Sequence, residues 1–231
     1  MSLPLFDAPQ YTTPIPSTGE TIKFRPFLVK EQKTLLMAQG ADITQQIDAI
    51  NQVITACTNG KVDVRKLSSF DAEFLFLQIR SRAVGENVEM VLTCECGEKT
   101  DATLDVTHVQ VLKNPGHSNQ IDLGNNRLIT MRYPRLEEVE EVTANRSVDG
   151  IIKLIASSID TIWNGDDKYD AVDYTVAELI EFVEGLSPAD LDQVEKFFDT
   201  MPTLAHDINW TCRACDSKNH VRVEGIQNFF A

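Results

Sequence analysis

The sequence predicts an α+β fold in which β-hairpins pack with helices and a mostly helical insertion separates the hairpins. Three observations predict it. The spacing of apolar residues changes from helical to alternating at Val88. Two cysteine pairs, Cys94 with Cys96 and Cys212 with Cys215, each stand where a hairpin should turn. Several helix-capping signals lie between the pairs.

Within the first hundred residues, the sequence predicts an extended arm, a hairpin and three helices. Prolines at positions 4, 9, 14 and 16 favour an extended N-terminal arm, which is a candidate contact with a partner protein. A turn at 16–20 separates strands at 11–15 and 21–24. Helices are expected from 29 to about 40, from about 44 to 57, and from the Ser68 N-cap to Gly85. Cys57 lies on an apolar helix face, which favours a buried small hydrophobe over a reactive thiol.

From Val88 the chain predicts a hairpin over 88–94 and 100–106, with the first cysteine pair at its tip. The next elements are a turn-rich segment at 114–126, a strand at 127–133, helices at 136–145 and 148–158, and a loop at 163–170. Thr175 opens a capped helix that ends at Gly185, and Ser187 with Pro188 opens another that ends near 201.

A last hairpin pairs 207–210 with 221–225 and carries the second cysteine pair, and Phe229 and Phe230 follow it. We therefore expect one α+β domain of residues 1–110 with 205–231. Residues 111–204 would be a mainly helical insertion.

The four paired cysteines predict a metal centre. Zinc takes four thiolates at tetrahedral corners, and a tight turn lets two sulfurs converge on one ion. Gly97 permits the left-handed turn that such a knuckle needs. The two hairpins would form a zinc-ribbon-like element with a structural Zn²⁺ on Cys94, Cys96, Cys212 and Cys215.

Three alternatives to this metal site stay open. The cysteines can be reduced thiols on turns, or Cys212 and Cys215 can be a redox C-x-x-C pair. His220 can replace a ligand such as Cys94.

Composition limits the function classes. The formal net charge of −14 opposes binding to nucleic acid and to anionic lipid. The N-terminus resembles neither a signal peptide nor an anchor, and no apolar run reaches the ~20 residues that span a bilayer. We therefore expect folding in a reducing cytosol, without disulfides.

No catalytic motif is present, so we expect no enzyme and no catalytic residues. Two acidic segments are expected to be solvated. Asp166, Asp167 and Asp170 lack the spacing of an EF-hand calcium loop. The alternative hypothesis for the glutamates at 137, 138, 140 and 141 is that they form a docking face for a basic partner.

Two long motifs carry a resemblance. Residues 22–31 read Ile-Lys-Phe-Arg-Pro-Phe-Leu-Val-Lys-Glu, and residues 70–82 read Phe-Asp-Ala-Glu-Phe-Leu-Phe-Leu-Gln-Ile-Arg-Ser-Arg, followed by Val84-Gly85-Glu86 and the first cysteine hairpin. The chain resembles the baseplate hub assembly proteins of T4-like contractile-tailed bacteriophages. The likeness covers residues 10–230, is best over 20–100, and consists of hydrophobic framework rather than chemistry.

The resemblance implies a phage protein made in the host cytoplasm that helps to build the baseplate hub with other baseplate or hub proteins. It implies no catalytic residues, and leaves open the oligomeric state and whether the protein stays in the virion tail baseplate. A second reading is a zinc-ribbon regulatory module that binds a host protein or nucleic acid, although the charge opposes nucleic acid. A third is a metal-dependent hydrolase, which would need a water on the zinc.

Overall fold

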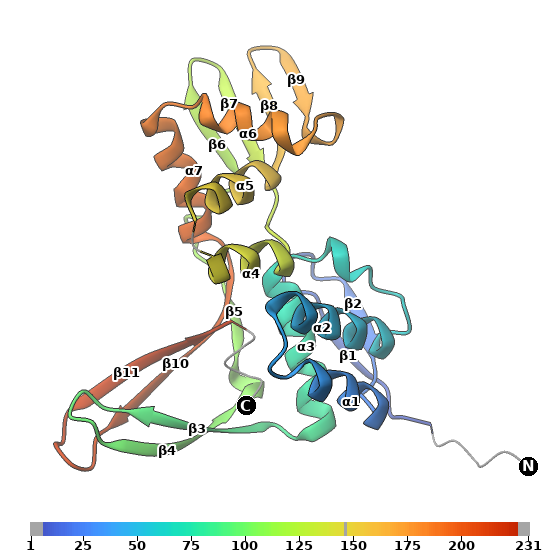
Figure 1. The fold of residues 1–231 in the computed structure, drawn as a ribbon, viewed down its shortest axis with the longest axis vertical. Coiled ribbons are helices and arrows are strands. Elements are labelled where there is room, and N and C mark those ends of the chain that lie inside the picture. The colour runs from blue at the N-terminus through green and yellow to red at the C-terminus, as the bar shows by residue number, and fades with distance from the viewer. Residues whose placement is uncertain (1–6, 146, 226–231) are drawn as a thin grey trace, which may run out of the picture. The chain divides into compact units, whose positions relative to one another are not determined.

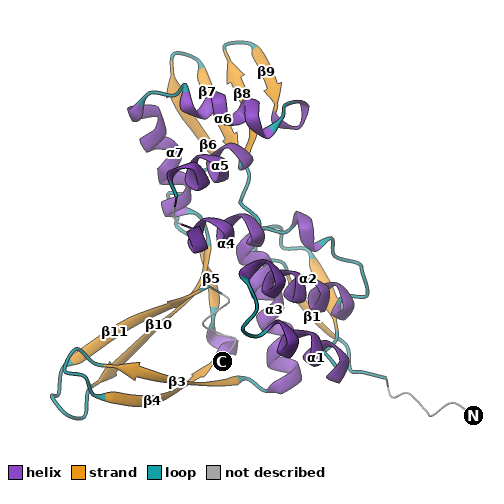
Figure 2. Cartoon of the chain, viewed as in Figure 1, coloured by secondary structure: helices purple, strands orange, loops and turns teal. Residues whose placement is uncertain are grey.

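A computed structural model describes residues 7–145 and 147–225, which form seven α-helices and eleven strands (Figure 1). The predicted α+β class is confirmed, because the strands make small antiparallel sheets of two to four strands among the helices (Figure 2). The chain divides into two compact units. We call the part up to Leu112 and from Thr203 onward the hairpin unit, and Lys113–Pro202 the inserted unit.

The hairpin unit begins with the predicted hairpin and three helices. Strands β1 (Tyr11–Pro14) and β2 (Thr21–Phe24) pair antiparallel, and α1 (Val29–Ala38), α2 (Ile43–Cys57) and α3 (Ser69–Val84) follow. A single 3₁₀ turn, Val64–Lys66, precedes α3. The predicted Ser68 cap is confirmed, because its side chain accepts a hydrogen bond from the Asp71 backbone N–H.

The helices α2 and α3 supply most of the buried side chains of this part. Their fully buried apolar members include Ile50, Val53, Ile54, Phe70, Leu75, Phe76, Leu77 and Ile79. Cys57 is also fully buried, which confirms its prediction as a small core residue.

The rest of the hairpin unit consists of two long hairpins. In one, β3 (Asn87–Thr93) pairs with β4 (Lys99–Asp105). In the other, β10 (Thr203–Thr211) pairs with β11 (Lys218–Glu224). Strand β5 (Gln110–Leu112), which follows a 3₁₀ turn at Val106–His108, adds to the start of β10. The two hairpins meet at their turns (Figure 1).

A shared cluster packs the bases of these hairpins against α3. Its buried members are Leu77, Val88, Leu104, Val106, Val109, Leu204 and Val223. Val88 and Met90, two of the alternating apolar residues of β3, therefore face this cluster, as a half-buried strand requires.

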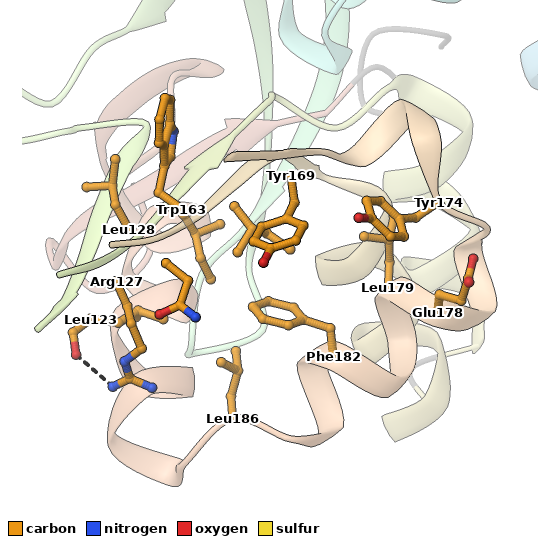
Figure 3. A pocket seen from close by; sticks show the side chains of 13 residues that line it. Leu123, Arg127, Leu128, Trp163, Tyr169, Tyr174, Glu178, Leu179, Phe182 and Leu186 are labelled. Carbon is orange, nitrogen blue, oxygen red and sulfur yellow. Dashed lines mark hydrogen bonds between the residues drawn. The ribbon is translucent and has the colours of Figure 1, made fainter. Parts of the chain in front are cut away.

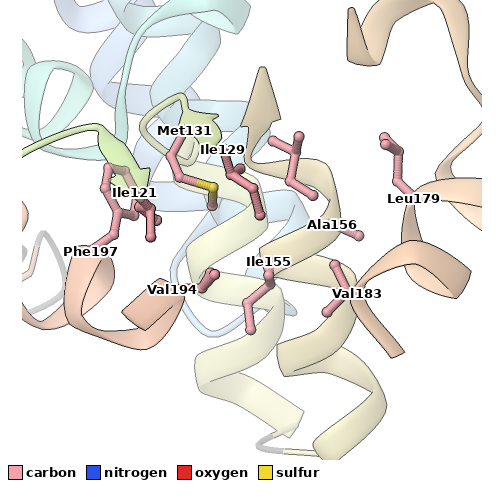
Figure 4. Close-up of a cluster of buried hydrophobic side chains, with 10 residues drawn as sticks. Ile121, Ile129, Met131, Ile155, Ala156, Leu179, Val183, Val194 and Phe197 are labelled. Atoms are coloured by element: carbon pink, nitrogen blue, oxygen red, sulfur yellow. The ribbon is translucent and has the colours of Figure 1, made fainter. Parts of the chain in front are cut away.

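The inserted unit is a four-stranded antiparallel sheet with helices. The strands lie in the order β6 (Gln120–Gly124), β7 (Arg127–Met131), β8 (Ile159–Asn164) and β9 (Asp167–Asp170). The helices are α4 (Leu136–Asn145), α5 (Val148–Ser157), α6 (Val176–Glu184) and α7 (Pro188–Thr200), with a 3₁₀ turn at Ala171–Asp173. Side chains from the sheet, α5, α6 and α7 converge on one core (Figure 4).

The predicted caps of this unit are confirmed. Thr175 and Glu178 form a capping box at the start of α6, and Ser187 and Asp190 form another at the start of α7, where Pro188 is the first helical residue.

One prediction of irregular structure is wrong, and another is incomplete. Residues 163–170, expected as a loop, form the end of β8, a turn at Gly165 and the strand β9. The turn-rich segment 114–126 contains β6, which reaches β7 through Asn125 and Asn126, both with positive φ. In both places the polar residues mark a hairpin turn, and the flanking strands are too short to show alternation.

Candidate metal centre

Each cysteine pair lies in a turn whose backbone folds around the first cysteine. In the first turn, the Cys94 N–H donates to the Glu98 carbonyl over 2.9 Å and the Gly97 N–H donates to the Cys94 carbonyl over 2.9 Å. In the second, the Cys212 N–H donates to the Ser217 carbonyl over 2.9 Å. These backbone hydrogen bonds form in both turns without an ion.

The residue after the second cysteine of each pair has a left-handed backbone. Gly97 has φ +88° and Asp216 has φ +54°, and the Asp216 N–H donates to the Cys212 carbonyl over 3.0 Å. The sequence predicted this role for Gly97 but not for Asp216. Aspartate tolerates the left-handed region better than most residues, which is the signal that could have identified it.

The structure brings together all four predicted sulfurs, from turns more than a hundred residues apart. All four lie within 4.8 Å of one another. The Cys94 and Cys215 sulfurs are 3.7 Å apart, and so are those of Cys96 and Cys212. A zinc ion with Zn–S bonds of about 2.3 Å has sulfurs about 3.8 Å apart at the edges of its tetrahedron. The donor set therefore fits a tetrahedral thiolate-binding ion in both chemistry and spacing.

Each turn contributes one buried and one exposed thiol. Cys94 and Cys212 are buried, whereas Cys96 and Cys215 are exposed. The cluster thus lies at the surface of the hairpin tips, where an ion can enter from solvent.

Hydrogen bonds around the cluster shift the pKa values of its thiols in opposite directions. Hydrogen bonding with Ser217 lowers the pKa of Cys94 to about 6 and also lowers the pKa of Cys215. For Cys96, the backbone bond from Glu98 lowers the pKa, but hydrogen bonds with the other three thiols outweigh it and raise the pKa to about 12. Without an ion the cluster therefore keeps some protons, which a cation bound by four thiolates must displace.

Ser217 and Asn219 are site residues that the sequence reasoning missed. The Ser217 hydroxyl lies 3.4 Å from the Cys94 sulfur and 3.2 Å from the Cys215 sulfur. The Asn219 amide donates to the Ser217 carbonyl over 3.0 Å, and its Oδ1 lies 3.5 Å from the Cys94 sulfur. Polar groups of this kind orient metal ligands. Their only sequence signal is their position just after Cys215.

The other candidate residues lie outside the cluster. His220, the alternative ligand, pairs instead with Asp207, with 3.1 Å between Nε2 and Oδ1. Burial raises the pKa of the Cys57 thiol to about 11, so it is protonated at neutral pH. Cys212 follows the end of a strand and does not begin a helix, so Cys212 and Cys215 lack the helix N-terminus that lowers a redox thiol's pKa.

The acidic segments are partly neutralised by neighbouring cations. Asp170 pairs with Lys168 at 2.7 Å, Glu138 with Arg132 at 2.7 Å, and Glu141 with Lys153 at 2.8 Å. Within the described ranges, the four cysteines are the only cluster of three or more side chains suited to a metal ion.

The inserted unit has a separate apolar pocket of about 440 Å³ between its sheet and α6 (Figure 3). Tyr169, Tyr174 and Phe182 face it. Arg127 stands at its edge, where the guanidinium donates to the Leu123 carbonyl and pairs with Asp190 at 3.3 Å. The guanidinium of Arg127 is therefore already paired with other residues of the inserted unit.

Comparison with protein families gives one match. A family model described as T4 bacteriophage base plate protein matches residues 8–231, which include both cysteine pairs. Searches of the curated proteins and of the solved structures each find no match. In the part of the chain that the structure describes, no helix is both long and apolar enough to cross a membrane.

Proposed function

We propose, from the premise that this chain belongs to the T4 bacteriophage base plate protein family, that it is a non-enzymatic protein of the baseplate hub. It acts in tail assembly, as a structural component or an assembly chaperone, and holds a structural zinc on Cys94, Cys96, Cys212 and Cys215. It contacts other baseplate or hub proteins, in the host cytoplasm during assembly and in the tail baseplate if it remains there.

The observation that carries the zinc proposal is the convergence of four sulfurs from two distant hairpins. A bound ion would join turns that are 116 residues apart, measured from Cys96 to Cys212. Metal-binding free energy then becomes folding free energy, because the unfolded chain has no preformed site. Four sulfurs fill a tetrahedral ion and leave no position for water or substrate, which supports a structural rather than a catalytic role.

Metal analysis tests the zinc. Purified protein should contain one zinc per chain by elemental mass spectrometry. Cys96→Ser and Cys212→Ser should each lose the ion, because three thiolates and a hydroxyl bind zinc more weakly than four thiolates. The matched control is Cys57→Ala, which removes a thiol outside the cluster and should retain zinc. A wild-type protein without metal, or a fully loaded Cys96→Ser variant, would contradict the proposal.

A pull-down from phage-infected cells tests the hub role. Tagged protein should be recovered with baseplate proteins, and phage that lack it should accumulate incomplete tails. The net charge of −14 opposes nucleic acid, so filter binding at low salt should show no retention of DNA or RNA. Recovery with host transcription factors alone would overturn the hub role and favour a regulatory module.

A further inference from the structure

One serine side chain contacts a cysteine from each of the two hairpin turns. The Ser217 hydroxyl lies 3.4 Å from the Cys94 sulfur of the first turn and 3.2 Å from the Cys215 sulfur of the second. Those two sulfurs are 3.7 Å apart, although their residues are separated by 121 positions in the sequence. A single hydroxyl is therefore placed to act on one ligand from each hairpin.

The backbone and the side chain of Ser217 have separate tasks. Its carbonyl accepts hydrogen bonds from the Cys212 N–H over 2.9 Å, which closes the second turn, and from the Asn219 amide over 3.0 Å. The Asn219 amide nitrogen also lies 3.4 Å from the Ser217 hydroxyl oxygen. Because Ser217 is exposed, removal of its hydroxyl leaves no buried cavity and breaks neither bond to the carbonyl.

The first turn has a glutamate at the position equivalent to Ser217. Glu98 also follows the second cysteine of its pair by two residues, and its carbonyl accepts a hydrogen bond from the Cys94 N–H over 2.9 Å. An ionised carboxylate only accepts hydrogen bonds, whereas a serine hydroxyl also donates one. At this position, therefore, only the second turn has a side chain that can donate to a thiolate.

A hydroxyl donor matters most when the sulfurs are charged. Four thiolates around a divalent zinc ion carry an excess of negative charge. A hydrogen bond to a charged acceptor is roughly twice as strong as one between neutral groups. Donors beside metal ligands also orient those ligands, and their loss typically costs about 10–100-fold in metal affinity.

We propose that Ser217 is a positioning residue of the metal centre. Its hydroxyl orients the Cys94 and Cys215 sulfurs toward one ion and draws negative charge from them, while Asn219 holds the serine in place. This inference rests on the proposed zinc site and names a residue that tunes its affinity.

The same hydroxyl distinguishes the two exposed thiols. The Cys215 sulfur has the hydroxyl beside it, whereas the Cys96 sulfur contacts the Cys212 sulfur and the backbone of Glu98. Donation of a hydrogen bond withdraws electron density from a sulfur and makes it a weaker nucleophile. In the zinc-loaded protein, Cys96 is therefore the more reactive of the two exposed ligands.

Competition for zinc between the full chain and a chromophoric chelator tests the effect on affinity. Ser217→Ala should weaken zinc binding by about 10-fold or more. Ser217→Thr keeps a hydroxyl and should bind zinc as the wild type does. The matched control is Glu98→Ala, which changes the equivalent position of the first turn and should not weaken binding.

Alkylation of the zinc-loaded chain with N-ethylmaleimide, mapped by mass spectrometry, tests the effect on reactivity. Cys96 should react before Cys215 in the wild type. Ser217→Ala should accelerate the reaction at Cys215 and leave the rate at Cys96 unchanged. A serine that only supported the shape of the turns would not act on one sulfur in this way, so faster alkylation at both positions would overturn the inference.

The outcomes separate this inference from the zinc proposal. A wild type that binds zinc, together with a Ser217→Ala variant of unchanged affinity, would overturn the role of Ser217 and leave the zinc site intact. Equal weakening in Ser217→Thr would show that the hydroxyl is not the active group, and would also overturn it. A wild type that binds no zinc would overturn both proposals.

Discussion

At the scale of single residues, both cysteine turns contain one residue with a left-handed backbone, but the amino acid at that position differs. Gly97 and Asp216 occupy equivalent positions after the second cysteine, and both have positive φ. Glycine adopts this region without cost, whereas most L-residues lose about 1–2 kcal/mol there. A Cβ atom added at Gly97 would have no neighbour within 4 Å, so only the backbone conformation decides the cost of a substitution.

We therefore predict that substitution of Gly97 is destabilising, whereas replacement of Asp216 by glycine is tolerated. Gly97→Ala should reduce the free energy of unfolding by about 1–2 kcal/mol, because alanine is strained at φ +88°. Asp216→Gly should change it by less than about 1 kcal/mol, because relief of strain is offset by a more flexible unfolded chain. Urea denaturation of the zinc-loaded proteins measures both. An Asp216→Gly loss as large as that of Gly97→Ala would show that the aspartate side chain, rather than the backbone, matters.

At the scale of elements, one strand-to-helix junction occurs twice. In the first, the Arg25 guanidinium and the Leu28 N–H each donate to the Glu31 carboxylate over 2.8 Å at the start of α1. In the second, Arg132 and the Arg135 N–H donate to Glu138 over 2.7 and 2.8 Å at the start of α4. Each arginine stands six residues before its glutamate and also donates to the carbonyl of the residue after itself.

This junction joins each strand to the following helix through a carboxylate. For Glu31, burial raises the pKa, but the hydrogen bonds from Arg25 and Leu28 outweigh burial and leave the pKa lowered. Glu138 shows the same balance, with Arg132 and Arg135 as donors. Removing either carboxylate would leave a partly buried guanidinium without its counter-charge.

We predict that the Glu31 junction makes the free energy of unfolding depend on pH in the acidic range. A carboxyl whose folded pKa is lowered stabilises the folded state above its unfolded pKa of 4.5, and this contribution is lost as pH falls through the lower folded value. Glu31→Ala should cost on the order of 3 kcal/mol at pH 7. The difference from wild type should shrink below about pH 4.5 in urea titrations across pH.

The capping box of α6 supplies the control for this prediction. Glu178→Ala removes a carboxylate of the same helical position, but an exposed one that accepts its hydrogen bonds from the N–H and hydroxyl of Thr175. It should cost less at pH 7 than Glu31→Ala. An equal loss in both variants would attribute the effect to helix capping rather than to the ion pair.

At the scale of the whole molecule, the four-cysteine cluster belongs to the hairpin unit alone. All four cysteines lie in the hairpin unit, at the tips of β3–β4 and β10–β11. The inserted unit has its own hydrophobic core, drawn from its sheet, α5, α6 and α7 (Figure 4). The cluster around Val88, Leu104 and Val223 packs the hairpin bases together and includes none of the four cysteines.

Removal of the proposed zinc should therefore loosen the molecule locally. With a chelator, we expect faster backbone hydrogen exchange at the tips of both hairpins, a smaller change near Val88 and Val223, and no change in β6–β9. Hydrogen-exchange mass spectrometry of chelated and zinc-loaded protein measures all three regions. Uniform loss of protection through the inserted unit, or unchanged hairpin tips, would show that the metal does not act as a local clamp.

Local signals predicted much of this architecture. Ser68, Thr175 and Ser187 cap their helices as predicted, because a cap depends on residues only three positions apart. The strands β6, β8 and β9 were missed, because the pairing partner of each, rather than its own pattern, makes it a strand. The addition of β5 to β10 joins residues 110–112 to residues 203–205, and no local pattern contains such a pairing.

The order of amino acids was enough to establish the α+β class, the helix starts and the two cysteine-bearing turns, because these depend on side-chain period, capping and turn residues close along the chain. The folded chain was needed to find that sulfurs 116 residues apart lie 3.7 Å from each other, that Ser217 contacts two of the sulfurs, and that His220 pairs with Asp207 instead. Distances between remote residues are set by the packing of the hairpin bases and α3, and this packing depends on the whole chain at once.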